Sequence, residues 1–316
     1  MPRTPRVVFF GTPDFAVASL EALKREVDVV LVVSQPDRPV GRGRKLAPPP
    51  VKAAAEAMGL EVIQPKVVKG RRFAERIAAL EPDFLVTAAF GRIMGPSLLA
   101  TPKKAPLNVH ASLLPRHRGA APANWAILDG DKETGVSIMK MVVELDAGPV
   151  YKTVSTSIRD DENSGELLMR LAPLGAKALL ETITRFDEMK PESQDDSLAT
   201  YAGMLQKKDG RIDWSKGAVS LCNHIRGMSP WPSAFTELNG KALKVHAARV
   251  VAPHGRENEP GAVIALTDDG IDVACGEGLL RLKELQLAGK KRLDAARFLV
   301  GNKVPIGTLL GTGLAG

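Results

Sequence analysis

The chain has 316 residues, a net charge of +7 and 44% hydrophobic residues, which favours about two domains with full hydrophobic cores. No segment reaches the ~20 consecutive apolar residues that cross a bilayer, so we expect no membrane partner. Two cysteines, Cys222 and Cys275, are too few and too far apart for a metal cluster or a disulfide framework, a pattern typical of a reducing cytoplasm.

The first 90 residues alternate between short apolar runs and helical patterns. Thr12 is expected to cap the first helix, followed by a first-turn proline and by Asp14. The turn after the first strand lacks the Gly-x-Gly-x-x-Gly pattern that binds a pyrophosphate, so a dinucleotide-dependent dehydrogenase is disfavoured. We predict a doubly wound, mostly parallel α/β sheet from strands at 6–10, 27–33, 61–63 and 83–88 and helices at 12–24, 51–58 and 71–80.

A basic insert follows the second predicted strand. Residues 34–50 read SQPDRPVGRGRKLAPPP. The stretch 38–45 within it contains four basic residues, Arg38, Arg42, Arg44 and Lys45, and no acidic residue. Glycines allow such a backbone to follow an irregular polyanion closely. A solvated surface loop explains the charge equally well. Because the insert leaves the carboxyl edge of the sheet, where the strand at 106–110 also ends, it can reach over a site at that edge.

Residues 108–122 read NVHASLLPRHRGAAP, and a helix is predicted at 122–129. Asn108 and His110 alternate along the predicted strand at 106–110, so their side chains share one face. An amide and an imidazole placed together can donate hydrogen bonds to a developing oxyanion. Taken alone, Asn-x-His at a strand end is most often structural.

Asp146 follows a β-rich run at 137–143, in a predicted tight turn ahead of a strand at 150–154. A carboxylate beside a histidine fixes the tautomer of the ring and stabilises its charged form. The alternative is that Asp146 only caps the turn. If the carboxylate meets His110, we expect it to orient the ring and to assist proton removal from an amine.

The remainder of the chain predicts a long helix at 163–189, a polar linker at 190–208 and a C-terminal domain at 209–316. Short β-like runs at 243–251, 262–265, 271–274 and 279–287 alternate with turns such as Asn239-Gly240, which indicates a small barrel resembling the OB type. From residue 205 onward basic residues outnumber acidic ones by five, so most of the net positive charge lies here. Such an excess favours an anionic partner, and solvated surface lysines explain it equally well.

The run from Asn108 to Pro122 resembles the signature of folate-dependent formyltransferases, and the sequence around Asp146 resembles their Leu-Asp-x-Gly motif. The segment PWP at 230–232 resembles the Pro-Trp-Pro segment that follows the linker in the two-domain members, so the likeness covers nearly the whole chain. His117 stands where the family often carries an aromatic residue, and Ser233 where glycine is commoner.

The resemblance implies a catalytic domain at 1–189 that uses 10-formyltetrahydrofolate as co-substrate, without a metal. It implies catalytic roles for Asn108, His110 and Asp146, and folate contacts from the loop residues Ser112, Leu113, Leu114 and Pro115.

The basic insert looks like the one that distinguishes the methionyl-tRNA formyltransferases, which formylate initiator methionyl-tRNA for translation initiation. That likeness implies tRNA contacts from Arg42 first, then from Arg38, Arg44 and Lys45, and from Lys207 and Lys208 after the linker. We expect a monomer.

Three alternatives remain at this point. A glycinamide ribonucleotide formyltransferase would not need residues 205–316, and a nucleotide-sugar formyltransferase would not need the basic insert. A tRNA-binding module with an inactive enzyme domain would not need the trio of Asn108, His110 and Asp146.

Overall fold

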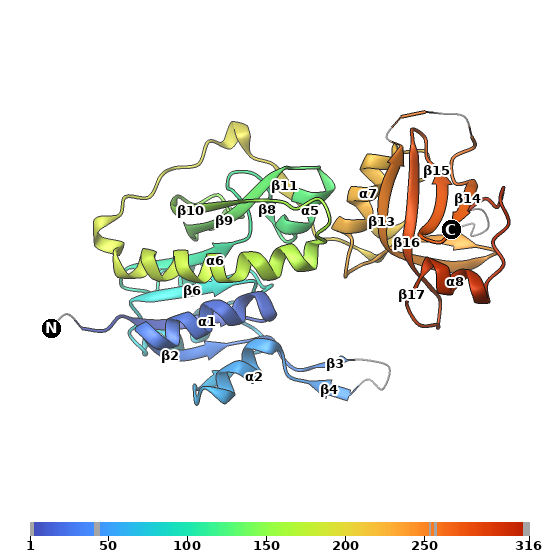
Figure 1. The fold of residues 1–316 in the computed structure, drawn as a ribbon. Helices are drawn as coiled ribbons and strands as arrows, with labels where there is room; N and C mark the ends of the chain where they lie inside the picture. The colour runs from blue at the N-terminus through green and yellow to red at the C-terminus, as the bar shows by residue number, and fades with distance from the viewer. Residues whose placement is uncertain (1–2, 41–44, 253, 256–257, 312–316) are drawn as a thin grey trace. The chain divides into compact units, whose positions relative to one another are not determined.

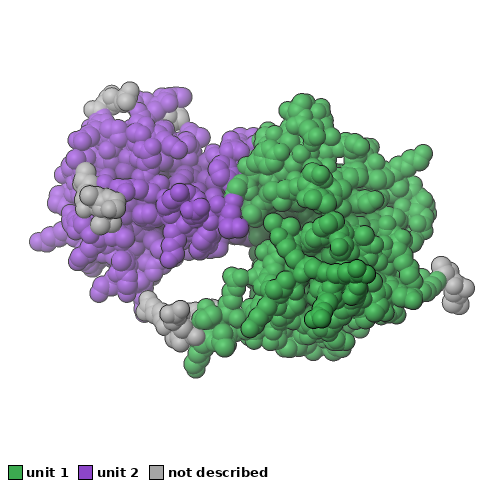
Figure 2. All heavy atoms as spheres, turned by 180° about the vertical axis from the view of Figure 1, so that it is seen from behind, with its two compact units in different colours: residues 1–122, 133–157, 168–203 green, residues 123–132, 158–167, 204–316 purple. Residues whose placement is uncertain are grey.

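The computed structural model describes residues 3–40, 45–252, 254–255 and 258–311 (Figure 1). Contacts along the chain divide it into two compact units, coloured separately in Figure 2. Unit 1 holds residues 1–122, 133–157 and 168–203, and unit 2 holds residues 123–132, 158–167 and 204–316. The segment 190–208, expected to be a linker, is therefore shared: its residues up to 203 belong to unit 1.

Unit 1 is built on a seven-stranded sheet in the order β10-β9-β7-β6-β1-β2-β5. The strands β5, β2, β1, β6 and β7 are parallel; β9 pairs antiparallel with β7, and β10 pairs antiparallel with β9 at the edge of the sheet. This confirms the predicted doubly wound, mostly parallel sheet. The strands are β1 (Arg6–Gly11), β2 (Asp28–Val33), β5 (Val62–Ile63), β6 (Phe84–Ala88), β7 (Ala105–His110), β9 (Glu133–Lys140) and β10 (Val150–Ser157).

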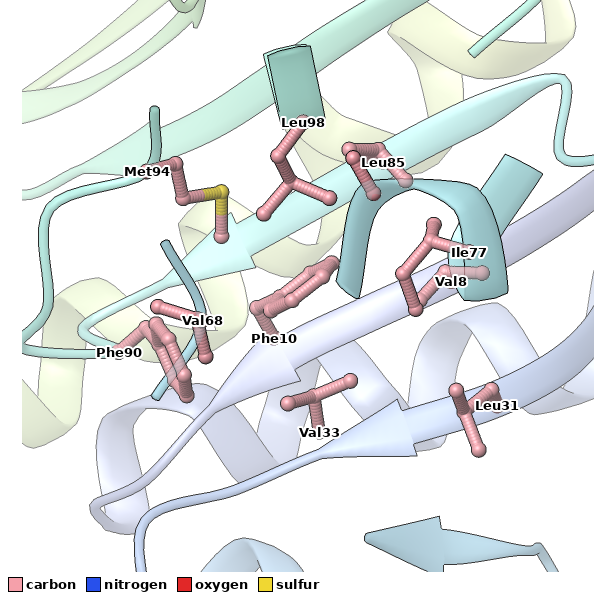
Figure 3. Packing of buried hydrophobic residues seen from close by; sticks show 11 residues of the cluster. Val8, Phe10, Leu31, Val33, Val68, Ile77, Leu85, Phe90, Met94 and Leu98 are labelled. Atoms are coloured by element: carbon pink, nitrogen blue, oxygen red, sulfur yellow. The ribbon is translucent and has the colours of Figure 1, made fainter. Parts of the chain in front are cut away.

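Strand β1 is buried on both faces, as a central parallel strand must be. Val8 and Phe10 point toward a cluster formed with side chains of β2, β6 and the helices α3 (Arg71–Ala78) and α4 (Pro96–Leu99) (Figure 3). Within it, Phe10 and Phe90 meet edge to face with ring centroids 5.4 Å apart. Two aromatic rings and several branched side chains packed in one layer hold the centre of the sheet rigid.

The other face of the sheet carries α1 (Asp14–Glu26) and the long α6 (Ser164–Thr184) (Figure 1). Gly175 of α6 lies directly against the side chains of Val109 and Val136, where a Cβ would be 2.7 Å from the nearer one. Because Val109 points toward α6, its neighbours Asn108 and His110 point to the opposite face. The remaining helix of the unit is α2 (Pro50–Ala57), and α5 (Pro122–Leu128) begins at its boundary.

Three local predictions are wrong. Thr12 does not cap α1: the N-cap is Pro13, and the Thr12 hydroxyl donates to the carbonyl of Phe90 at 3.1 Å. Strand β9 ends at Lys140 rather than 143, because Val143 lies outside the sheet with 68% of its surface exposed. Helix α6 ends at Thr184, and the short 3-10 helix η1 (Phe186–Glu188) follows it.

Part of the basic insert forms a two-stranded hairpin, which the sequence pattern did not predict. The strands β3 (Arg38–Val40) and β4 (Lys45–Ala47) pair antiparallel, with Arg38 opposite Ala47. Arg42 and Arg44 fall between them and lie outside the described residues.

The first part of the expected linker packs along the edge of unit 1. Glu192 and Val150 exchange backbone hydrogen bonds, and β11 (Tyr201–Ala202) pairs parallel with β8 (Arg118–Gly119). Along the chain, the 3-10 helix η2 (Asp196–Leu198) lies between Glu192 and β11. These contacts are hydrogen bonds to residues far away in the sequence. A local hydrophobic period therefore does not predict them.

Where the sequence predicted a small OB-like barrel, unit 2 contains an antiparallel β-domain with a sheet in the order β12-β13-β16-β15-β14. Asn239 and Gly240 form the predicted hairpin turn, both with positive φ. Residues 307–311 bond to Val263 beside one edge of the sheet and to Glu237 at the other, so this segment joins the two edges. The elements are η3 (Lys207–Gly210), α7 (Ala218–Gly227), β12 (Ala234–Leu238), β13 (Lys241–Ala252), β14 (Val263–Thr267), β15 (Gly270–Ala274), β16 (Leu279–Leu287), β17 (Leu293–Asp294) and α8 (Ala295–Gly301).

In the described part of the chain, no helix combines the length and the apolar character that a membrane span requires.

Candidate active site

The candidate site lies at the carboxyl end of β7, where the parallel strands of unit 1 end. Open α/β sheets bind their ligands at this edge. Asn108 is partly exposed here, and its carboxamide has no hydrogen-bond partner among the residues that the structure describes. An amide with free donors at this edge is available to an incoming ligand.

His110 is almost fully buried, with its two ring nitrogens facing different groups. Nε2 lies 2.9 Å from the backbone carbonyl of His117. Because a carbonyl oxygen only accepts, Nε2 carries the hydrogen of this bond. Nδ1 lies 3.7 Å from Oδ2 of Asp146, which is close enough for strong electrostatic attraction and longer than a hydrogen bond.

Asp146 is held in a tight turn between β9 and β10. Its Oδ2 accepts the backbone N–H of Gly119 at 2.9 Å. The φ of Asp146 is 49°, in the left-handed region that residues other than glycine rarely adopt. Gly148 completes the turn, because a Cβ there would lie only 1.8 Å from the carbonyl oxygen of Lys140. The structure thus brings Asp146 to His110, as the sequence interpretation required.

The loop after β7 is shaped by its own hydrogen bonds. Ser112 is fully buried, and its hydroxyl donates to the carbonyl of Arg116 at 2.6 Å. Ser137 of β9 donates to the carbonyl of Ser112 and accepts the N–H of Leu114. Ser112 therefore fixes the loop, whereas Leu113, Leu114 and Pro115 are half-buried and retain surface for a ligand.

Three groups that contact His110 or the turn of Asp146 could not be found from residue type. The carbonyl of His117 and the N–H of Gly119 belong to the backbone, which every residue supplies. The sequence marks position 119 only by its glycine, which the structure requires, because its φ is 126° and a Cβ would lie 2.5 Å from the carbonyl oxygen of Ala202. The third group, the side chain of Gln194, lies in the segment expected to be a linker.

The described basic residues of the expected tRNA surface are all exposed. Arg38 and Lys45 lie on the hairpin of unit 1, and Lys207 and Lys208 lie in η3 of unit 2. The side chain of Arg38 donates to Oε1 of Gln35, which ties the base of the hairpin to the end of β2.

Asp37 anchors the same base. Gln64 donates to its carboxylate at 2.7 Å and Lys52 at 3.0 Å, and these two contacts, the Gln64 bond foremost, lower the pKa of Asp37 below its usual value. The carboxylate therefore stays charged and bound to these partners at neutral pH.

The arrangement can carry out one kind of chemistry well. A free amide at Asn108 can donate to an oxygen that gains negative charge, and the imidazole of His110 with a carboxylate behind it can hold or move a proton. Acyl transfer to an amine requires both functions.

Comparisons with known proteins agree over both units. Residues 5–183 match the family described as formyl transferase, and residues 204–303 match its C-terminal domain. The methionyl-tRNA formyltransferase of Geotalea daltonii is 50% identical over 97% of this chain and 98% of its own length. That of Citrifermentans bemidjiense is 49% identical over 97% of this chain and 96% of its own length.

Among solved structures, the sugar 3N-formyl transferase WlaRD shares the fold with a TM-score of 0.65. The two chains are 15% identical, and the match covers 92% of this chain and all of that one. By the family match and by these relatives, the chain belongs to the formyl transferase family.

Proposed function

We propose that this protein transfers the formyl group of 10-formyltetrahydrofolate to the amino group of methionyl-initiator tRNA. The relatives that carry this activity in their names are about half identical to the chain over nearly its whole length. The observation that carries the chemical part of the proposal is the approach of Asp146 to His110 beside the free amide of Asn108.

The reaction forms one C–N bond and breaks another. The amine of methionine attacks the formyl carbon, and the carbonyl oxygen gains a negative charge that Asn108 and a protonated His110 stabilise. The bond between the formyl carbon and N10 of the folate then breaks. The amine loses one proton and N10 gains one, so the charges balance.

The ring of His110 enters this scheme through Nδ1. Because Nε2–H is donated to the carbonyl of His117, Nδ1 is the nitrogen that remains for substrate and faces Asp146. We assign Asp146 to orienting the charged ring and to taking up the proton of the amine, directly or through a water molecule.

We assign the folate to the loop formed by Leu113, Leu114 and Pro115, whose buried end Ser112 fixes. We assign the RNA to the basic residues of the hairpin, Arg38, Arg42, Arg44 and Lys45, and to Lys207 and Lys208. Contacts of this kind with phosphates make binding fall steeply with salt. The domain at 209–316 serves RNA binding in this proposal, and the reaction takes place in the cytoplasm, where translation starts.

One experiment tests the proposal. The protein is incubated with 10-formyltetrahydrofolate and, separately, methionyl-initiator tRNA, glycinamide ribonucleotide and an amino sugar nucleotide. Only the charged tRNA should yield a formylated product, and uncharged tRNA, which lacks the amine, is the matched control. Product from either small amine alone would overturn the assignment.

A variant of His110 separates catalysis from RNA binding. His110→Ala should abolish formyl transfer and leave tRNA binding unchanged, since the ring is buried and offers almost no surface to the RNA. Transfer retained by this variant would contradict the mechanism.

A further inference from the structure

Gln194 contacts the turn that carries Asp146. Its Nε2 donates both of its hydrogens to this turn, one to the carbonyl of Asp146 at 2.8 Å and one to the carbonyl of Gly148 at 2.7 Å. A primary amide has two donors on that nitrogen, so both are used. A single side chain therefore holds the backbone on both sides of residue 147.

The orientation of Gln194 is itself fixed. Its Oε1 accepts the Nε–H of Arg118 at 3.0 Å, and Arg118 is buried and also donates to Asp196 at 2.7 Å. A guanidinium can only donate, so the amide oxygen must face Arg118 and the amide nitrogen must face the turn. The three hydrogen bonds allow one orientation of the carboxamide.

The turn needs such a support. Asp146 has a positive φ, a conformation that is unfavourable for a residue with a side chain. The two hydrogen bonds from Gln194 to the carbonyls of Asp146 and Gly148 oppose this cost and keep the turn in its conformation.

The same segment also fixes the other partner of His110. Thr200 accepts the N–H of His117 through its hydroxyl at 2.8 Å, and the carbonyl of His117 is the acceptor for Nε2 of His110. Residues 192–202 thus support both groups that face the imidazole, one through Gln194 and one through Thr200.

We propose that Gln194 is a positioning residue for the reaction, which holds the carboxylate of Asp146 against Nδ1 of His110. This inference deepens the proposed function and rests on it. Gln194 does not face the reacting atoms; it acts through the backbone of the 146–148 turn.

The test replaces Gln194 by Met, which keeps the length of the side chain and removes all three hydrogen bonds. We expect kcat to fall about 10- to 100-fold, as small misplacements of catalytic groups do, with KM for the folate and for the tRNA unchanged. Ser193→Ala is the matched control, because Ser193 is the exposed neighbour on the same segment. Equal kcat for the two variants would overturn the proposal.

A double variant distinguishes positioning from general loss of structure. In the Asp146→Asn background, Gln194→Met should cost no further kcat, because the carboxylate that Gln194 positions is already absent. A full additional loss in the double variant would show that Gln194 acts elsewhere and would overturn the inference.

A readout without activity keeps this proposal separate from the proposed function. The ¹⁵N signals of the His110 ring should change in Gln194→Met and stay unchanged in Ser193→Ala. If the wild type forms no formylated tRNA while the ring signals respond, the function fails and the positioning role stands; unchanged ring signals refute the role.

Gln194→Glu covers the case in which the Met variant does not fold. It keeps the acceptor for Arg118 and sets a carboxylate oxygen against the two carbonyls. We expect folding to be retained and kcat to fall as in the Met variant, and wild-type kcat would refute the role.

Discussion

Replacing Asp146 by Asn tests the central pair of the site most directly. Asparagine keeps the shape of the side chain and its acceptor for the N–H of Gly119, and it removes the charge that faces His110. Both side chains are largely buried, with 5% and 16% of their surface exposed, so water screens the pair little.

The expected size of the effect follows from the distance. Two unit charges 3.7 Å apart interact by about 4.5 kcal/mol at an effective dielectric constant of about 20. Since 1.4 kcal/mol corresponds to a factor of ten, the full interaction is equivalent to roughly three powers of ten in rate. Part of the interaction between Asp146 and His110 is already present before the reaction starts and does not lower the barrier. We therefore expect kcat to fall about 100- to 1,000-fold.

The assay measures formylmethionyl-tRNA formed at saturating folate and tRNA, over a range of pH. KM for both substrates should stay close to that of the wild type, because the carboxylate stabilises charge in the transition state. Asp187→Asn is the control, since the side chain of Asp187 is 78% exposed and pairs with Lys104 outside the site. A loss below fivefold, with an unchanged acidic limb of the pH profile, would refute the pairing of Asp146 with His110.

Three further predictions concern the free amide, the RNA contact and pH. Asn108→Ala should lower kcat by two to three powers of ten and leave the affinity for the folate unchanged; retained activity would remove Asn108 from the mechanism. Arg42→Ala, at a position outside the described residues, should raise KM for the tRNA about tenfold and reduce the salt slope of binding by about one, and an equal rise in KM for the folate would contradict a tRNA contact. Burial lowers the pKa of His224, so the folded state favours the neutral form of the ring. The contribution of His224 to stability is therefore complete above the unfolded pKa near 6.5, and it is lost as the pH falls toward the lower folded pKa. His224→Gln should therefore flatten the decline in the free energy of unfolding below pH 6.5, as urea titrations can measure, and an unchanged decline would contradict the burial argument.

The parallel sheet could be predicted because its strands are buried on both faces. A run such as Val7 to Phe10 has no polar position, and this pattern is typical of a central parallel strand. The alternation of Asn108 and His110 likewise fixed their common face. Both inferences use only the period of two along a strand, which depends on local geometry.

The supports of the site could not be predicted in the same way. Gln194 and Thr200 lie in a polar stretch without a hydrophobic period, and their partners are backbone groups and a guanidinium far away in the sequence. Such bonds depend on the tertiary path of the chain. For the same reason the strand pairing at 38–47 was not predicted, because the prolines and glycines of this segment are typical of turns.

The anchored base of that hairpin has a consequence for molecular recognition. Gln35 and Asp37 are already bound to Phe90, Lys52 and Gln64 before any partner arrives. Fixing the backbone of one residue costs roughly 1 to 2 kcal/mol of conformational entropy. A polyanion that docks on Arg38 and Lys45 meets strands whose ordering was completed during folding, so more of its attraction is retained as affinity.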